Sequence, residues 1–225
     1  IIYMNSRIPP ITLNLIIINV IFWLVEVIIP SKFGIDIVEL LGLHYWLSEK
    51  FHFYQLITNM FLHDPSGLSH LIFNMFGLFM FGSEVEQMWG GKKFLFFYFF
   101  TGIGASIIQE LSWMIDTHSL VTAFNTAIAE GNGTALLPFE HMFTGGGSIS
   151  NATLSNIITL KAQFLSSFIS IGASGALFGV LLAFAWLFPE AKMGIIFLPI
   201  MIPSRIFVVI YAVVELFFVV AFFAF

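Results

Sequence analysis

The sequence predicts an all-α membrane protein: a polytopic bundle of membrane-spanning helices that forms one domain over residues 1–225. Three observations support this prediction, namely 59% hydrophobic residues, only 9% charged residues, and apolar runs long enough to cross a bilayer. Soluble domains carry about 25% charged residues, so this chain has too few ionic side chains to cover a surface that faces water. A soluble globular domain is therefore excluded, and so is disorder, which requires low hydrophobicity.

Five segments have the length of about 20 mostly apolar residues that a helix needs to cross the hydrocarbon core. We expect Pro30 to end the first segment and Glu84 with Glu86 to close the second. The fourth stops before Pro189, and the fifth reaches Phe225 within apolar sequence. The expected spans are residues 11–29, 68–85, 93–115, 168–188 and 206–225.

The positive charges of the connections predict how the bundle is oriented, because lysine and arginine are enriched in cytoplasmic connections. With alternating helices, most of these charges fall on one side of the membrane: Arg7, Lys92, Lys93, Lys192 and Arg205. The N-terminus is therefore expected in the cytoplasm, and the expected location is the cell membrane, as in a bacterial inner membrane. Two long loops, residues 31–67 and 116–163, are expected on the outer side.

The two outer loops differ in composition. Residues 35–41 and 51–61 alternate apolar and polar side chains at near-helical spacing, so the first loop is expected to lie at the membrane interface with its apolar side toward lipid. The second loop is rich in glycine, serine, threonine and asparagine over residues 131–156. We expect it to be mobile around Gly145–Gly147 and assign it no chemistry.

The composition also limits the partners and cofactors. A net charge of −5 offers no basic surface for nucleic acid. The absence of cysteine removes disulfides, zinc–thiolate sites and cysteine nucleophiles. The lipid bilayer is the expected partner, no metal or organic cofactor is implied, and the sequence indicates no oligomeric state.

His70 and Asn74 are the first pair of polar residues inside an apolar span. Their i, i+4 spacing places both side chains on one face of a helix. Two such hydrogen-bonding groups can bind an anion or a substrate carbonyl, since polar residues at membrane depth are costly and commonly functional. The alternative is a structural role, because histidine and asparagine also hydrogen-bond between membrane helices.

Ser174 stands among small residues at the start of the fourth span, in the sequence Gly172-Ala-Ser-Gly175. A serine near a helix start lies close to backbone N–H groups that have no partner within the helix. Such donors can stabilise an oxyanion. The alternative is close helix packing, because Gly175 and Gly179 form a small-xxx-small pattern.

Three acidic residues lie in or beside the apolar spans. Glu86 is close to the turn that follows the second span and is expected to be structural. Glu110 lies toward the outer end of the third span. Glu215 is ten residues past Arg205 and is therefore expected near mid-membrane. A proton-relay role is one hypothesis for it, but its own span contains no second acid that could share the proton.

In order along the chain, these motifs resemble those of the rhomboid family of intramembrane serine proteases. The motifs are His70-x-x-x-Asn74, then Gly82-Ser-Glu-Val-Glu86-x-x-x-Gly90, then Gly172-Ala-Ser174-Gly175. Residues 54–63 also resemble the approach to the second helix of that family. The resemblance implies a rhomboid-like bundle in which the chain contains five of six core helices.

The resemblance also implies roles for individual residues. Ser174 would be the nucleophile, and His70, Asn74 and the backbone N–H of Ser174 would form the oxyanion hole. The site would be lined by Gly172, Gly175 and Phe178, the last of these in the position of an aromatic ring that packs against the catalytic histidine. Glu86 and Gly90 would be structural, and the substrates would be transmembrane proteins cleaved near the outer membrane face.

The sequence departs from the family at the general base. Rhomboid proteases take this histidine from an Ala-His-x-x-Gly segment in a sixth helix, and none of the six histidines here has that context. We therefore expect the chain as given to be inactive alone, with the base on a missing helix. The competing hypotheses are a rhomboid-like protein that binds or escorts membrane helices, and a small transporter or channel.

Overall fold

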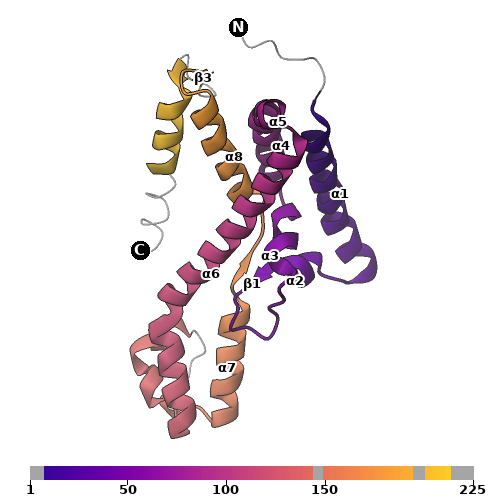
Figure 1. The fold of residues 1–225 in the computed structure, drawn as a ribbon. Coiled ribbons are helices and arrows are strands. Elements are labelled where there is room, and N and C mark those ends of the chain that lie inside the picture. Colours follow the sequence, from indigo (N-terminus) through magenta and orange to yellow (C-terminus); the bar gives the residue numbers. More distant parts are fainter. Residues whose placement is uncertain (1–7, 144–148, 195–200, 214–225) are drawn as a thin grey trace.

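The computed structural model describes residues 8–143, 149–194 and 201–213 and is built almost entirely of helices. Three helical segments are long and apolar enough to cross a membrane: Pro10–Phe33, Leu68–Trp89 and Gly91–Glu130. Two shorter apolar helices, Ser174–Leu187 and Ser204–Val213, pack with or follow them. In Figure 1, α1, α5, α6 and α8 gather at the upper end, and α6 runs diagonally down to α7. The prediction of an all-α membrane protein is confirmed.

Helix α1 (Pro10–Phe33) forms the first span and is longer than expected. Proline suits its first turn, where the missing N–H would have no partner in any case. Pro30 does not end the helix, contrary to the prediction, because it lies only one turn before the C-terminus. The helix ends at Gly34, whose φ of +67° lets its N–H donate back to the carbonyl of Pro30.

The second span consists of α4 (Leu68–Gly77), the π-helical turn η2 (Leu78–Gly82) and α5 (Ser83–Trp89). It continues four residues past the predicted end at residue 85. Glu84 and Glu86, which were expected to close the span, lie within the helix. The chain turns at Gly90, which has a φ of +79° and ψ of 151°. A positive φ of this size favours glycine.

Helix α6 (Gly91–Glu130) has 40 residues and corrects the predicted boundary between the third span and the second loop. After the exposed Lys92 and Lys93, its exposed side chains are apolar as far as Ile115, which is 71% exposed. From Asp116 on, the exposed positions are mostly polar. The apolar part therefore ends where predicted, whereas the helix itself continues for four more turns into residues expected to form a loop.

A second hydrophobic core explains why α6 continues. The 3₁₀ helices η3 (Thr134–Met142) and η4 (Ile149–Asn151) and the helix α7 (Leu154–Ser166) fold back against its C-terminal part. The buried side chains of this core are Leu120, Phe124, Ala127, Leu136, Ile149 and Ile157. Residues 116–163 are therefore a helical module wherever the structure describes them, while Gly145–Gly147 lie outside the described residues.

Helix α8 (Ser174–Leu187) is shorter than the predicted span 168–188 because the chain before it is extended. This extended segment includes the strand β2 (Ile169–Ser170). After α8, β3 (Lys192–Gly194) pairs antiparallel with β4 (Met201–Pro203). The helix 204–213 then starts the predicted fifth span, 206–225, whose remainder, including Glu215, lies outside the described residues.

The first loop, residues 34–67, contains the short helices α2 (Ile37–Leu41), α3 (Gln55–Thr58) and η1 (Asn59–Phe61). These agree with the helical periodicity of the sequence. The strand β1 (Leu43–His44) lies between them and pairs antiparallel with β2, with Leu43 opposite Ser170. This pairing joins the first loop to the segment that leads into α8.

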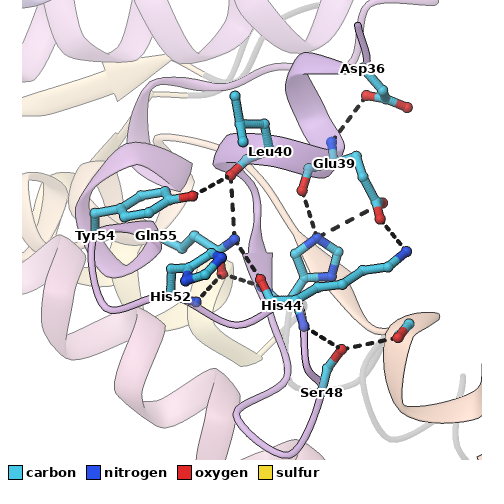
Figure 2. Close-up of polar contacts among 10 residues, drawn as sticks. Asp36, Glu39, Leu40, His44, Ser48, His52, Tyr54 and Gln55 are labelled. Atoms are coloured by element: carbon cyan, nitrogen blue, oxygen red, sulfur yellow. Dashed lines mark hydrogen bonds and ion pairs between the residues drawn. The ribbon is translucent and has the colours of Figure 1, made fainter. Parts of the chain in front are cut away.

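A single buried side chain, Gln55, holds the first loop together (Figure 2). Its Oε1 accepts the backbone N–H groups of His44 (3.3 Å) and His52 (3.0 Å). Its Nε2 donates to the carbonyls of Leu40 (3.4 Å) and Lys50 (3.0 Å). Because an amide offers both donors and an acceptor, one side chain satisfies backbone groups from three turns of the loop.

Glu86 ties the start of α1 to the second span. Its carboxylate accepts the backbone N–H groups of Ile11 (3.0 Å) and Thr12 (2.7 Å) and the hydroxyl of Thr12 (2.8 Å). The first N–H groups of a helix have no partner within it, and Pro9 at the N-cap position makes no side-chain bond to them. The buried acid of α5 therefore acts as the N-terminal cap of α1.

We predict that Glu86→Ala strongly destabilises the fold. It would leave two backbone donors and one hydroxyl without an acceptor, at a cost of about 3 kcal/mol or more in unfolding free energy. Thr12→Val is the matched control, since it removes only one of these bonds and should cost about 1 kcal/mol. Equilibrium unfolding in mixed detergent micelles measures both, and equal effects of the two variants would contradict a capping role.

Candidate active site

Ser174 is the first residue of α8 and is exposed at the end of that helix. The chain reaches it through Gly172, whose φ of +130° lies in the region that favours glycine. The N–H of Gly172 donates to the carbonyl of Asn59 (2.9 Å), which fixes the segment against η1. The N–H of Ser174 itself is among those that a helix start leaves unpaired, as the sequence suggested.

The side chains of His70 and Ser174 both lie close to Gly172. A Cβ built on Gly172 would be 3.3 Å from Cε1 and 3.4 Å from Nε2 of His70, and 3.5 Å from Oγ of Ser174. The imidazole and the hydroxyl therefore face the same small space, which only a residue without a side chain leaves open. Of the predicted site residues, the structure brings these three together.

Asn74 lies one turn beyond His70 on the same face of α4 and is buried. Its Nδ2 donates to the carbonyl of His70 at 2.9 Å, so part of its capacity is used within its own helix. An amide nitrogen carries two hydrogens, and one remains for a ligand. Asn74 therefore makes one structural hydrogen bond and has a second N–H available as a donor. This arrangement agrees both with a structural role and with binding of a substrate carbonyl or anion, the two roles considered from the sequence.

Close contact between α6 and α8 sets the position of Ser174. A Cβ on Gly175 would come within 2.5 Å of the Cβ of Ala105, and one on Gly179 within 2.5 Å of Thr101. Gly175 is thus a packing residue next to the serine. The small-xxx-small alternative weighed for this segment describes Gly175 and Gly179 correctly, and it coexists with the exposure of Ser174.

A cavity of about 110 Å³ opens beside Ser174. Its polar lining comes from four segments, with Asn59 of η1, Ser106 and Gln109 of α6, Ser170 of β2, and Ser174. Gly172 and Gly175 also line it. Ser106 and Gln109 were not predicted as site residues, although their i, i+3 spacing within an apolar run was a usable signal.

Phe178, Glu86 and Gly90 lie elsewhere. The ring of Phe178 packs on that of Tyr211, with centroids 5.7 Å apart, so among the described residues its aromatic partner is a tyrosine of the last helix. Glu86 and Gly90 lie at the other end of the second span from His70. No cluster of three or more histidine or acidic residues suited to a metal ion is present in the described part of the chain.

An aromatic cluster holds the segment that precedes the serine. The ring of Phe168 packs against those of Tyr45 (5.9 Å between centroids), Trp113 (5.7 Å) and Phe164 (5.1 Å). The carbonyl of Phe168 accepts the N–H of Tyr45. The first loop, α6 and α7 thus meet six residues before Ser174, which limits the freedom of the chain between them.

Two residues beside His70 have perturbed ionisation. His63 is fully buried, and burial together with the neighbouring His70 ring, 5.2 Å away, lowers the pKa of its imidazole to about 4. Asp64 is exposed, and hydrogen bonds from Ser66 lower the pKa of its carboxyl. His63 is therefore neutral and Asp64 ionised near pH 7.

Comparison with known proteins finds similarity over part of the chain. Residues 50–127 match the family model of the Rhomboid domain. A stretch of 58 residues is 40% identical to the protein named RHOMBOID-like protein 6, mitochondrial, from Arabidopsis thaliana. That stretch is 26% of this chain and 18% of the plant protein, so the match spans less than a fifth of that relative's length.

Fold and site together define a polytopic helical membrane protein with a serine exposed at the start of a short helix, beside a polar cavity. The matched domain includes His70 and Asn74 but stops before Ser174. Over residues 50–127 the chain is therefore similar to the Rhomboid domain.

The shifted pKa of His63 predicts how stability depends on pH. Between about pH 4 and pH 6.5 the unfolded chain binds a proton at this residue that the folded chain does not. The contribution of the neutral His63 to the free energy of unfolding is therefore fully present above pH 6.5. It is lost as the pH falls toward 4. His63→Gln should flatten this part of a pH–stability profile measured by detergent unfolding, whereas the exposed control His118→Gln should leave it unchanged. An unaltered profile in His63→Gln would contradict the assignment.

Gly172→Ala should disturb the candidate site. The added methyl would meet the His70 ring at 3.3 Å in a backbone conformation that L-residues rarely adopt, at a cost of about 1–3 kcal/mol. Gly104→Ala is the control, since its methyl meets nothing within 4 Å among the described residues and alanine favours a helix interior. Unfolding measurements should show a loss for the first variant and no loss for the second. Equal stability would show that the close approach at Gly172 is not required.

Proposed function

We propose that this chain is a rhomboid family member that forms the nucleophile and oxyanion parts of an intramembrane serine endopeptidase. The observation that carries the proposal is that the side chains of His70 and Ser174 both lie close to Gly172, and that Ser174 and Gly172 line a polar cavity. A packing contact alone requires neither an exposed hydroxyl at the helix start nor a space kept free of side chains in front of it.

In the proposed reaction, Oγ of Ser174 attacks a backbone carbonyl of the substrate. The carbonyl oxygen becomes an oxyanion, which accepts hydrogen bonds from the imidazole of His70, the amide of Asn74 and the N–H of Ser174. Donors preorganised toward a developing charge are the largest catalytic term in many enzymes. The helix start of α8 adds the positive end of its dipole at the same place.

The proton of the serine requires a general base, since a serine hydroxyl is a weak nucleophile without one. His70 cannot supply it while it donates to the oxyanion. No histidine in the described part of the chain, His70 included, lines the cavity. In the proposal, the base is a histidine on a helix that follows Phe225, and it takes the proton from Ser174 and gives it to the leaving amine.

The proposed substrates are transmembrane helices that unwind locally, because an intact helix keeps its carbonyls in hydrogen bonds. A cavity of about 110 Å³ suits a small side chain next to the cleaved bond. The proposed site of action is the outer membrane face, which follows from the expected orientation. The cell membrane is the proposed location.

The second candidate is a rhomboid-like protein that binds or escorts membrane helices without cleaving them. The absence of a histidine from the cavity lining, in the described part of the chain, favours it if no histidine base is supplied from elsewhere. The exposed Ser174 counts against it, because binding alone does not require a hydroxyl held opposite His70.

Ser174→Ala should abolish cleavage in a chain extended through the helix that carries the base. A single-span model substrate in proteoliposomes provides the assay. His70→Ala and Asn74→Ala should each lower kcat by about 10²–10³, the usual effect of losing one oxyanion donor. Ser170→Ala is the matched control, because Ser170 lines the cavity without the nucleophile's position at the helix start. Retained cleavage by Ser174→Ala would refute the endopeptidase function and favour the binding protein.

A further inference from the structure

Glu26 is a buried acid that the proposed mechanism does not use. It lies in α1 with 2% of its surface exposed, and both carboxylate oxygens accept the backbone N–H of His63, at 3.2 and 3.1 Å. One turn earlier, Nε1 of Trp23 donates to the carbonyl of Asp64 at 3.3 Å. Glu26 therefore holds the N–H of His63, and Trp23 holds the carbonyl of Asp64. These two bonds to α1 fix the peptide that joins residues 63 and 64.

The turn that follows restrains the same peptide. Oδ1 of Asp64 accepts the N–H (2.8 Å) and the hydroxyl (2.7 Å) of Ser66. The backbone carbonyl of Asp64 accepts the N–H of Gly67 (3.4 Å). Pro65 limits Asp64 to extended conformations. The N–H of Asp64 thus has a fixed direction, and it donates to Nδ1 of His70 at 3.4 Å.

A neutral imidazole carries one hydrogen, so a ring nitrogen that accepts a bond forces the hydrogen onto the other. With Nδ1 accepting from Asp64, the hydrogen of His70 is on Nε2. This nitrogen lies close to Gly172, 3.4 Å from the point where a Cβ of that residue would lie. In the other tautomer, Nε2 would present a lone pair to the oxyanion and repel it.

We propose that Asp64, held by Glu26 and Trp23 of α1 and by the Asp64–Ser66 turn, fixes the tautomer of His70 that can donate to the oxyanion. This inference rests on the proposed function for its catalytic meaning, but the tautomer itself does not. Asp64, Glu26 and Trp23 are positioning residues, since they act through His70. The arrangement gives the first helix a role at a site to which it contributes no reacting group.

The test measures the tautomer directly. The 225-residue chain is labelled with ¹⁵N and ¹³C at histidine in detergent micelles, and the ring correlations of His70 are assigned by their loss in His70→Gln. The expected result is a single Nε2–H tautomer at neutral pH. Asp64→Pro removes the donating N–H and should convert this pattern into a mixture of tautomers. Asp64→Asn keeps the N–H and the acceptor for Ser66 and should leave the pattern unchanged.

A second pair of variants covers the case in which Asp64→Pro does not fold. Glu26→Gln retains an oxygen that accepts from His63 and should keep the single tautomer, whereas Glu26→Leu should lose it. An Nδ1–H tautomer in the unmodified chain, or an identical pattern in every variant that folds, would overturn the proposal.

Activity separates this inference from the proposed function. In a chain that carries the base, Asp64→Pro and Glu26→Leu should lower kcat at an unchanged KM, and Glu26→Gln should restore kcat. If Ser174→Ala remains active while the tautomer responds as expected, the proposed function fails and the tautomer assignment stands. If cleavage depends on Ser174 but the tautomer does not respond, only the present inference fails.

Discussion

Polar groups at membrane depth have no water to bind, so they must find hydrogen-bond partners within the protein. Three buried glutamates act in the same way here, because the carboxylate of each accepts backbone N–H groups. Glu86 accepts the first N–H groups of α1, Glu26 accepts the N–H of His63, and Glu110 accepts the N–H of Trp46 at 2.9 Å. Each acid lies on a long helical segment and binds backbone from another part of the chain. These contacts join the first span, the first loop and α6 into one structure, on which the candidate site depends.

The first loop shows how these contacts reach the site. Glu26 and Glu110 fix it from two sides, and Gln55 satisfies its interior backbone groups (Figure 2). A loop held in this way can present β1 to β2 and the carbonyl of Asn59 to Gly172. The segment before α8 is therefore fixed by residues more than 100 positions earlier in the chain. This segment in turn sets the position of Ser174.

Much of this organisation could be predicted from the sequence. Apolar length and composition indicated the helical membrane bundle, and the i, i+4 spacing placed His70 and Asn74 on one face. Other features depended on tertiary contacts that periodicity does not record. Helix α6 continues past Ile115 because of a second core, and α8 begins only at Ser174 because Gly172 has a positive φ. Glu26 went unnoticed because a single acid in an apolar span does not reveal its partner.

The proposed site requires that the side chains of His70 and Ser174 lie close to each other beside Gly172. The chain contains no cysteine, so the double variant His70→Cys, Ser174→Cys provides two unique thiols for a short bifunctional cross-linker. The account predicts efficient cross-linking of this pair and none for His118→Cys with Ser174→Cys. Position 118 lies about 18 Å along α6 from Ser106 of the cavity lining. Thiols at 70 and 174 that each react singly but never become linked would contradict the account.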